Sequence, residues 1–259
     1  MNKIKGKFNA AHIMRMTDDT GMFQHARYSI PDLDKGYTTD DNARALIMAV
    51  MLYEYLPKKD YLSLVYRYLG FVLYAQNDSG GFRNFMTYSR QFTEEEGSED
   101  CFGRCLWALG YTLASPAMPG GIKRACTSAV KRARTRIPNI TSLRGQANTM
   151  IGLDLIGGQE AKVFMPSLAE SLLTQYEQHA TQAWHWFENR LTYDNAVLPW
   201  ALLAAYRSLG QDQLLRTARE SLEFIDQITF RNGYFQAIGC KGWMEKGAEP
   251  ALYDEQPIE

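Results

Sequence analysis

Between residues 36 and 46 the chain reads Gly36-Tyr37-Thr38-Thr39-Asp40-Asp41-Asn42-Ala43-Arg44-Ala45-Leu46. A threonine here can cap a helix, and the two acids then fall in its first turn, where the helix macrodipole favours negative charge. Apolar residues continue at helical spacing until Pro57, so the pattern predicts a long helix over residues 37–56. Capping accounts for one acid. The second acid, the amide and the arginine make this helix start a candidate functional site.

The acidic helix start recurs along the chain. Ser98-Glu99-Asp100 precedes a helical pattern that ends near residue 113, and Thr192-Tyr193-Asp194-Asn195 precedes one that ends near residue 209. Leu252-Tyr253-Asp254-Glu255-Gln256 has the same character, and an additional helix start without acids lies near residue 141. Successive starts are roughly 40–60 residues apart, an interval that fits one helical hairpin with its loop.

The fold class predicted from these patterns is all-α, because no segment shows sustained period-two alternation. We expect one domain over residues 1–259, with a short helix (8–16) and a functional loop in residues 1–36 and helical hairpins in 37–259. Pro166 is tolerable in its helix only near the first turn or at a kink. The other expected elements are an extended piece at 82–88 and helices at 60–76, 99–113, 122–136, 141–155, 161–181, 194–209 and 212–229.

Composition excludes several function classes. The formal net charge is −1 and no basic cluster suggests a nucleic-acid surface. No apolar run reaches membrane-spanning length and the N-terminus lacks a signal-peptide core, so we expect a cytoplasmic protein without a membrane partner. The four cysteines and four histidines follow no metal-ligand spacing, so we expect buried free thiols, no metal and no cofactor.

Several stretches carry a resemblance to a known superfamily. They are residues 19–26, 36–46, 98–109, 144–149, 191–199 and 253–259. Together with the hairpin spacing, they resemble the six-hairpin glycosidase superfamily, whose fold is an (α/α)6 toroid. They are similar to a functionally unassigned bacterial branch whose members often carry the names glycosyltransferase or glycosidase. The resemblance covers nearly the whole chain and brings no assigned catalytic pair with it.

A full toroid of this kind has twelve helices, whereas the sequence predicts eight or nine. We therefore expect an array that is incomplete at its C-terminus. Such an array would expose apolar helix faces, so pairing with a second copy as a homodimer is a further expectation.

The resemblance implies that the inner helices begin around a central funnel where a sugar binds. Glycoside hydrolysis uses two carboxyl groups, one as general acid and the other as base or nucleophile. The first choice of pair is Asp41 with Asp100, followed by Asp194, and Asp40 and Glu99 are further catalytic candidates. The alternative for each acid is that it only caps its helix.

The candidate substrate-binding residues lie in the same helix starts and in loops rich in aromatic residues, among them residues 184–190 and 232–239. We call these the aromatic loops. Aromatic rings can stack on the apolar face of a sugar, or they can fill the core. Amides can bind sugar hydroxyls or satisfy loop backbone, and arginines can bind an anionic ligand or pair with the acids. The candidates are Tyr37, Phe82, Trp184, Trp186 and Trp243 for stacking; Asn84 and Asn189 as amides; Arg44 and Arg144 as cations; and His25, Glu188 and Glu255.

The function predicted from the sequence is a carbohydrate-active protein that acts on an oligosaccharide or glycoside, with a glycoside hydrolase as the first choice. A non-catalytic carbohydrate-binding or accessory domain that partners a glycosyltransferase would keep the aromatic loops but need no close acid pair. A sugar epimerase would call for histidines in the funnel, and only His25 and His185 are placed for that role.

Overall fold

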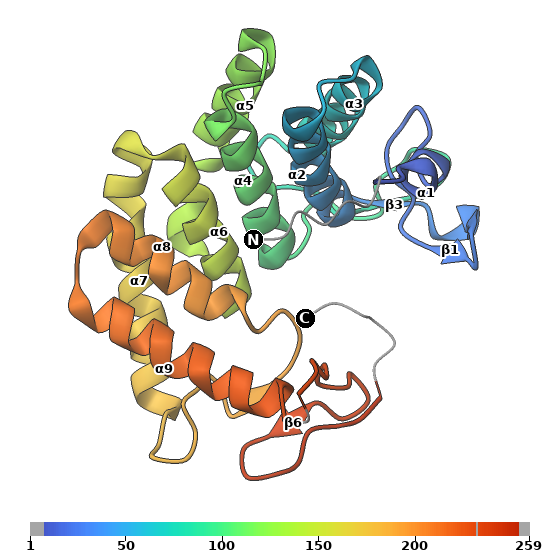
Figure 1. Ribbon diagram of the computed structural model, residues 1–259. Coiled ribbons are helices and arrows are strands. Elements are labelled where there is room, and N and C mark those ends of the chain that lie inside the picture. The colour runs from blue at the N-terminus through green and yellow to red at the C-terminus, as the bar shows by residue number, and fades with distance from the viewer. Residues whose placement is uncertain (1–7, 232, 254–259) are drawn as a thin grey trace. The chain divides into compact units, whose positions relative to one another are not determined.

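The computed structural model describes residues 8–231 and 233–253, and it divides the chain into two compact units, Met1–Thr135 and Arg136–Glu259. In both units the described residues form long helices joined by loops, and the β-structure is limited to two-residue ladders (Figure 1). The predicted all-α class is therefore confirmed. Nothing in the structure tests the expectation of a single domain.

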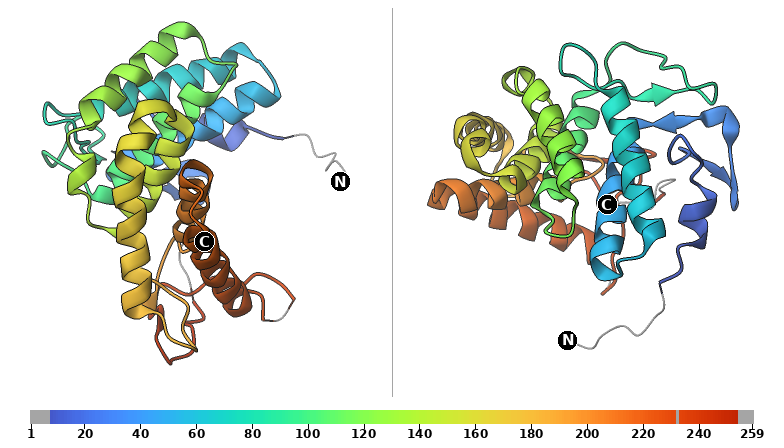
Figure 2. Two further views of the ribbon diagram at one scale, coloured as in Figure 1. Left: turned by 90° about the vertical axis from the view of Figure 1, so that its left-hand side faces the viewer. Right: turned by 90° about the horizontal axis from the view of Figure 1, so that it is seen from above.

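The first unit contains two helical hairpins preceded by an N-terminal segment. Helix α2 packs against both α3 and α4, and α4 packs against α5. The N-terminal segment lies beside α3 (Figure 2), where the Thr17 and Tyr68 hydroxyls are 2.7 Å apart. The elements are α1 (Ala11–Arg15), β1 (Ala26–Arg27), β2 (Ile30–Pro31), η1 (Leu33–Lys35), β3 (Tyr37–Thr38), α2 (Thr39–Tyr55), α3 (Lys59–Ala75), β4 (Phe85–Met86), α4 (Glu99–Ala114) and α5 (Gly120–Ala133).

The second unit repeats this plan. Helix α6 packs against α7 and α8, and α8 packs against α9, so the described residues of the chain hold four sequential hairpins. The elements are η2 (Ile137–Asn139), α6 (Leu143–Ile156), α7 (Gly158–His179), β5 (Arg190–Leu191), α8 (Val197–Leu209), α9 (Asp212–Thr229) and β6 (Met244–Glu245). The hairpin repeat predicted from the acidic helix starts is present.

Two helix starts differ from the prediction for identifiable backbone reasons. Helix α7 begins at Gly158 because Gly157, with φ 65°, ends α6 and directly precedes α7. Pro166 consequently lies inside α7 and not near its first turn, which leaves a kink as the remaining expected alternative. Helix α8 begins at Val197, because Asp194 adopts φ 50° and cannot belong to a right-handed helix.

The short ladders bring loops back to the helix starts. Strand β3 pairs antiparallel with β4, with Tyr37 opposite Met86 and Thr38 opposite Phe85. In the second unit β5 pairs with β6, with Arg190 opposite Glu245. The β3–β4 ladder places the loop that follows α3 directly over the first turn of α2.

The N-terminal segment is joined to the helices through a small apolar cluster and one buried amide. Met16, Phe23, Tyr37, Phe71 and Met86 form the cluster, in which the rings of Phe23 and Tyr37 stack with centroids 4.9 Å apart. The fully buried Asn42 donates from Nδ2 to the carbonyls of Met22 (3.2 Å) and Thr38 (2.8 Å), and its Oδ1 accepts the Met22 N–H (2.8 Å).

Across the described ranges, every helix is too short or too polar to cross a bilayer.

We expect Asn42→Ala to lower the free energy of unfolding by about 2–4 kcal/mol, because it removes the hydrogen bonds of a buried amide to three backbone groups. Urea denaturation measures the change, and amide exchange at Met22 should accelerate. The exposed Gln91→Ala is the matched control and should change stability by less than about 0.5 kcal/mol. An Asn42 variant as stable as this control would contradict the assigned role.

Candidate functional site

The start of α2 satisfies its backbone N–H groups with side chains. Thr38 is the N-cap, and its hydroxyl accepts the Asp41 N–H at 3.2 Å while donating to the Asp41 carboxylate at 2.5 Å. The loop after α3 supplies the remaining acceptors: the Asn84 carbonyl accepts the Thr39 N–H (2.9 Å) and the Asn84 side chain accepts the Asp40 N–H (3.1 Å). Asn84 is thus engaged in satisfying backbone, one of its two predicted roles.

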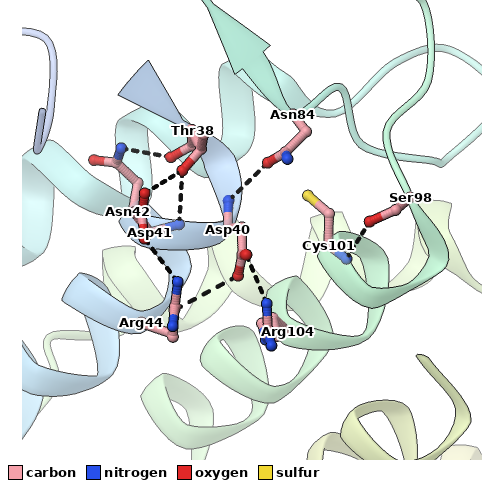
Figure 3. Close-up of polar contacts among 9 residues, drawn as sticks. All are labelled: Thr38, Asp40, Asp41, Asn42, Arg44, Asn84, Ser98, Cys101 and Arg104. Carbon is pink, nitrogen blue, oxygen red and sulfur yellow. Dashed lines mark hydrogen bonds and ion pairs between the residues drawn. The ribbon is translucent and has the colours of Figure 1, made fainter. Parts of the chain in front are cut away.

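Asp40 is the more enclosed of the two acids at the start of α2. Its side chain is 19% exposed and faces α4, where Arg104 Nη1 donates to Oδ2 at 2.6 Å (Figure 3). Arg44 Nε lies 3.6 Å from the other oxygen, Oδ1, which is buried and makes no hydrogen bond with the described residues. Burial raises the pKa of Asp40 above its ordinary value, and the neighbouring Arg104 and Arg44 offset only part of that effect.

Asp41 lies beside Asp40 but is held differently. Arg44 Nη2 donates to its Oδ1 at 2.7 Å, and the Thr38 hydroxyl holds the other oxygen (Figure 3). Arg44 therefore bridges the two carboxylates, which matches the predicted alternative of an inward ion pair for this arginine. We refer to Asp40, Asp41, Arg44 and Arg104 as the α2 acid cluster.

The start of α4 adds two further acids next to this cluster. Ser98 caps α4 by accepting the Cys101 N–H at 3.2 Å, and both Glu99 and Asp100 are partly exposed in the first turn. Asp100 precedes Arg104 by one helical turn, so it lies on the same face of α4 that meets Asp40. Asp100 therefore shares a face of α4 with Arg104, and Glu99 is the other acid of the same first turn.

In the second unit, Arg144 organises a separate polar cluster at the start of α6. Its side chain is 6% exposed and donates to the Tyr193 carbonyl (2.6 Å), to Glu188 Oε2 (2.8 Å) and to Asn195 Oδ1 (3.3 Å). The guanidinium also lies over the Tyr193 ring, 4.7 Å from its centroid. Arg144 and Glu188 are therefore paired with each other, so Arg144 does form an ion pair, but its partner is Glu188 and not one of the candidate catalytic acids.

Asp194 lies neither inside α8 nor at its N-cap, so the capping alternative for this acid does not apply. With φ 50° it stands three residues before α8, whose N-cap is Ala196. The neighbouring Asn195 stabilises this turn instead, through hydrogen bonds with the N–H (3.2 Å) and carbonyl (2.8 Å) of Thr192. Asp194 itself is partly exposed in this turn.

Four of the five rings proposed for sugar stacking are packed into the interior. Tyr37, Phe82, Trp184 and Trp186 are each buried, so their ring faces contact protein and the core-filling alternative applies to them. Tyr37 is also held by a 2.6 Å hydrogen bond from its hydroxyl to Asp18. Trp243 differs because it is partly exposed, with its ring centroid 6.3 Å from that of Tyr193.

The remaining candidates are dispersed. His25 and Asn189 are exposed on loops, and His185 contacts the Tyr176 hydroxyl through Nδ1 at 3.3 Å. Glu255 lies outside the described residues, as does Asp254. Among the described residues no group of three His, Cys, Asp or Glu side chains is arranged to hold a metal.

Sequence reasoning missed two contributors to the α2 acid cluster. Arg104 was not singled out, although its spacing of four residues from Asp100 on a predicted helix was a usable signal. The second is Glu94, whose Oε1 accepts the N–H groups of Asn84 (2.5 Å) and Phe85 (2.6 Å). It thereby fixes the loop that covers the start of α2.

The comparisons with known proteins identify a fold. Neither the family models nor the curated proteins contain a match to this sequence. Among solved structures, a sugar epimerase from a ruminal bacterium matches with a TM-score of 0.67 and 12% identity, over 94% of this chain and 75% of that one. The cellobiose 2-epimerase of Bacillus thermoamylovorans matches with a TM-score of 0.70 and 10% identity, over 93% and 73%. The fold is that of the (α/α)6 toroids. At these identities the match describes the fold alone, and the predicted superfamily resemblance is supported at that level.

We expect Arg104→Gln to raise the pKa of Asp40 further, because the closest opposite charge is removed. Carbon-13 NMR titration of the aspartate carboxyls, assigned with Asp40→Asn, measures the shift. A carboxyl with a raised folded-state pKa destabilises the fold as pH rises from its unfolded to its folded pKa, so the loss of stability should extend to higher pH and become larger in this variant. Arg44→Gln should have a smaller effect, and equal shifts in both variants would contradict the assigned geometry.

Arg144→Met should lower the free energy of unfolding by about 2–4 kcal/mol. This loss is smaller than that for a fully buried ion pair, because Glu188 is 29% exposed and water can solvate its carboxylate in the variant. Urea denaturation measures the loss. Glu188→Gln is the matched control and should cost less, because its amide oxygen can still accept from Arg144. The assignment of Arg144 as the organiser of this cluster would be wrong if the two variants were equally destabilised.

Proposed function

We propose that this chain is a carbohydrate-active enzyme and that the α2 acid cluster, with Asp100, cleaves glycosidic bonds with two carboxyl groups and water. Two observations support the proposal. The fold is shared with two solved structures whose names describe enzymes that act on sugars. The start of α2 encloses the carboxyl group of Asp40, and the first turn of the facing helix α4 carries a second carboxyl group, Asp100. Hydrolysis by an acid and a base requires two such groups.

The observation that carries the proposal is the burial of Asp40, which raises the pKa of its carboxyl group. A general acid must keep its proton near the working pH, and glycosidases achieve this by raising the pKa of one carboxyl group. Burial has that effect on Asp40, and its Oδ1 makes no hydrogen bond with the described residues. We assign Asp40 the role of proton donor to the leaving-group oxygen.

The second carboxylate is Asp100 or Asp41. Asp100 lies in the first turn of the helix that faces Asp40, so a sugar placed between the two helix starts would have an acid on each side. Asp41 is closer in sequence, but Thr38 and Arg44 already occupy its oxygens. We therefore place Asp100 first as the base or nucleophile and assign Asp41 to positioning Arg44.

In the second unit, Trp243 is the proposed stacking ring. It is partly exposed and lies next to the Tyr193 ring, which itself contacts Arg144. An aromatic face next to a charged and hydrogen-bonded cluster provides both the apolar and the polar contacts that a pyranose needs.

Epimerisation is the second candidate, favoured by the names of both solved neighbours. It needs groups that remove and return a proton, a role that histidine performs near neutral pH. Within each unit, no hydrogen bond joins two of the four histidines, and His25 is exposed on a loop. Carboxylate chemistry therefore has the stronger structural basis.

The test is turnover of aryl glycosides and of manno-, gluco- and galacto-oligosaccharides by the wild type and by Asp40→Asn, Asp41→Asn and Asp100→Asn. We expect Asp40→Asn to lower kcat by about 10²- to 10⁴-fold, and Asp100→Asn to do the same. The wild-type rate should fall as pH rises through the raised pKa of Asp40, because the protonated form is the active one. An aryl glycoside with a good leaving group should partly rescue Asp40→Asn but not Asp100→Asn.

Asp60→Asn is the matched control, because Asp60 is also a first-turn acid, on α3, and is exposed. It should leave turnover unchanged. Proton NMR of the same sugars in D2O detects epimerisation directly, through a new epimer without loss of the glycosidic bond. Detection of such an epimer would show that the chain catalyses epimerisation and not hydrolysis. Binding of a sugar without any turnover would show that the site only recognises the sugar.

A further inference from the structure

A concave site lies in the first unit, on the side of α3 that meets the N-terminal segment. It is a cavity of about 310 Å³ lined by residues of α3, of the turn at Asp19 and Thr20, and of the chain around β4. Its volume is at the lower end of the range for small-ligand sites, sufficient for a single sugar ring. None of its lining residues belongs to the α2 acid cluster.

The floor and walls of this cavity are set by residues spaced one helical turn apart. Tyr66, Gly70 and Tyr74 follow each other at intervals of four on α3, so they share one face of the helix. A Cβ atom added at Gly70 would meet nothing within 4 Å, so the glycine leaves open space between the two tyrosines. Both tyrosines are more than half exposed, at 55% and 59%.

The Tyr74 ring is held in place by Phe92 and Arg83. Its ring lies 5.6 Å from that of Phe92, and the Arg83 guanidinium lies 5.6 Å from its centroid. An exposed aromatic ring that is fixed before binding loses little conformational entropy when a ligand stacks on it. Tyr74 therefore has the properties of a stacking platform for the apolar face of a pyranose.

The polar rim of the cavity has an excess of positive charge. Arg90 pairs with Asp19 at 2.7 Å, whereas Arg67 makes no hydrogen bond or ion pair with the described residues. Arg90 also adopts φ 64°, an unfavourable backbone region for a residue with a side chain, and such residues concentrate at ligand sites. The three charged side chains sum to one positive charge, which suits a ligand with one negative charge.

We propose that this cavity, the α3 tyrosine site, binds a carboxylated pyranose, a uronic acid unit of a glycan. The sugar ring stacks between Tyr66 and Tyr74 over Gly70, and its carboxylate pairs with Arg67, whose planar guanidinium suits bidentate recognition of a carboxylate. The proposal goes beyond the catalytic role assigned to the α2 acid cluster and does not depend on it.

The experiment is titration of the full chain with methyl glucuronide and methyl galacturonide, followed by calorimetry or by NMR of labelled protein. The neutral methyl glucoside and methyl galactoside serve as ring-only probes, and inorganic phosphate serves as the anion-only probe. We expect at least one uronide to bind at least tenfold more tightly than its neutral counterpart and than phosphate. Asp40→Asn should bind the uronide as the wild type does, so failure of the proposed catalysis leaves this test intact.

Two variants locate the binding. Gly70→Leu places a side chain in the cavity and should weaken uronide binding at least tenfold, while helix propensity makes the fold as stable as the wild type or more so. Arg67→Gln should weaken uronide binding at least tenfold and leave binding of the neutral glycoside unchanged. Gly121→Leu and Arg124→Gln on α5 are matched controls, because Gly121 also has open space around it and Arg124 is exposed.

The proposal is overturned by any of three results: no uronide binding at saturating concentrations, equal binding by the wild type and the folded Gly70→Leu, or equal binding of phosphate and uronide. Equal binding of charged and neutral sugars, unaffected by Arg67→Gln, would likewise overturn the assignment of a carboxylated ligand.

Discussion

The unpaired N–H groups at the start of α2 are the constraint on which the first unit depends. A helix leaves its first N–H groups without intrahelical acceptors, and an enclosed helix start must recruit acceptors from elsewhere. Thr38 provides one, and the chain at Asn84 provides two, although it is more than forty residues away. The loop after α3 is consequently fixed over the helix start. The same contacts place Asp40 between two helices, where its charge is costly and two arginines are needed to hold it.

In the second unit, a cation fixes the loop that lies against a helix start. At the start of α6, Arg144 reaches three acceptors on the chain before α8, so one buried side chain fixes the loop that the β5–β6 ladder also holds. The two units therefore share a hairpin plan but differ in the charge at the helix start. Acids dominate at α2, and a paired arginine dominates at α6. This difference explains why the proton-transfer role is placed in the first unit.

The fold followed from the sequence because its signals are local. Helical periodicity, Pro57 and the Ser/Thr caps act over a few residues, and the expected bounds of α9 (Asp212–Thr229) agree with the structure at both ends. The departures arose where glycine or a positive φ decided the boundary, as at Gly157 and Asp194. Aromatic burial was harder to predict, because a ring in a loop has the same local sequence whether the loop folds over a core or opens to solvent. The partners of Asp40 depend on which helices pack together, and a single sequence does not record this.

The bonds that join Asn84 to the start of α2 also bear on how the first unit folds. Helical hairpins such as α2–α3 form from contacts close in sequence, whereas the Asn84 contacts require the closure of a loop of more than forty residues. The carboxyl groups at this helix start thus acquire their surroundings late, after the helices have paired. A partly folded chain would contain its helices while Asp40 remained hydrated, without the rise in pKa that burial causes. The ionisation of that one side chain is therefore a direct spectroscopic indicator of whether the first unit has completed folding.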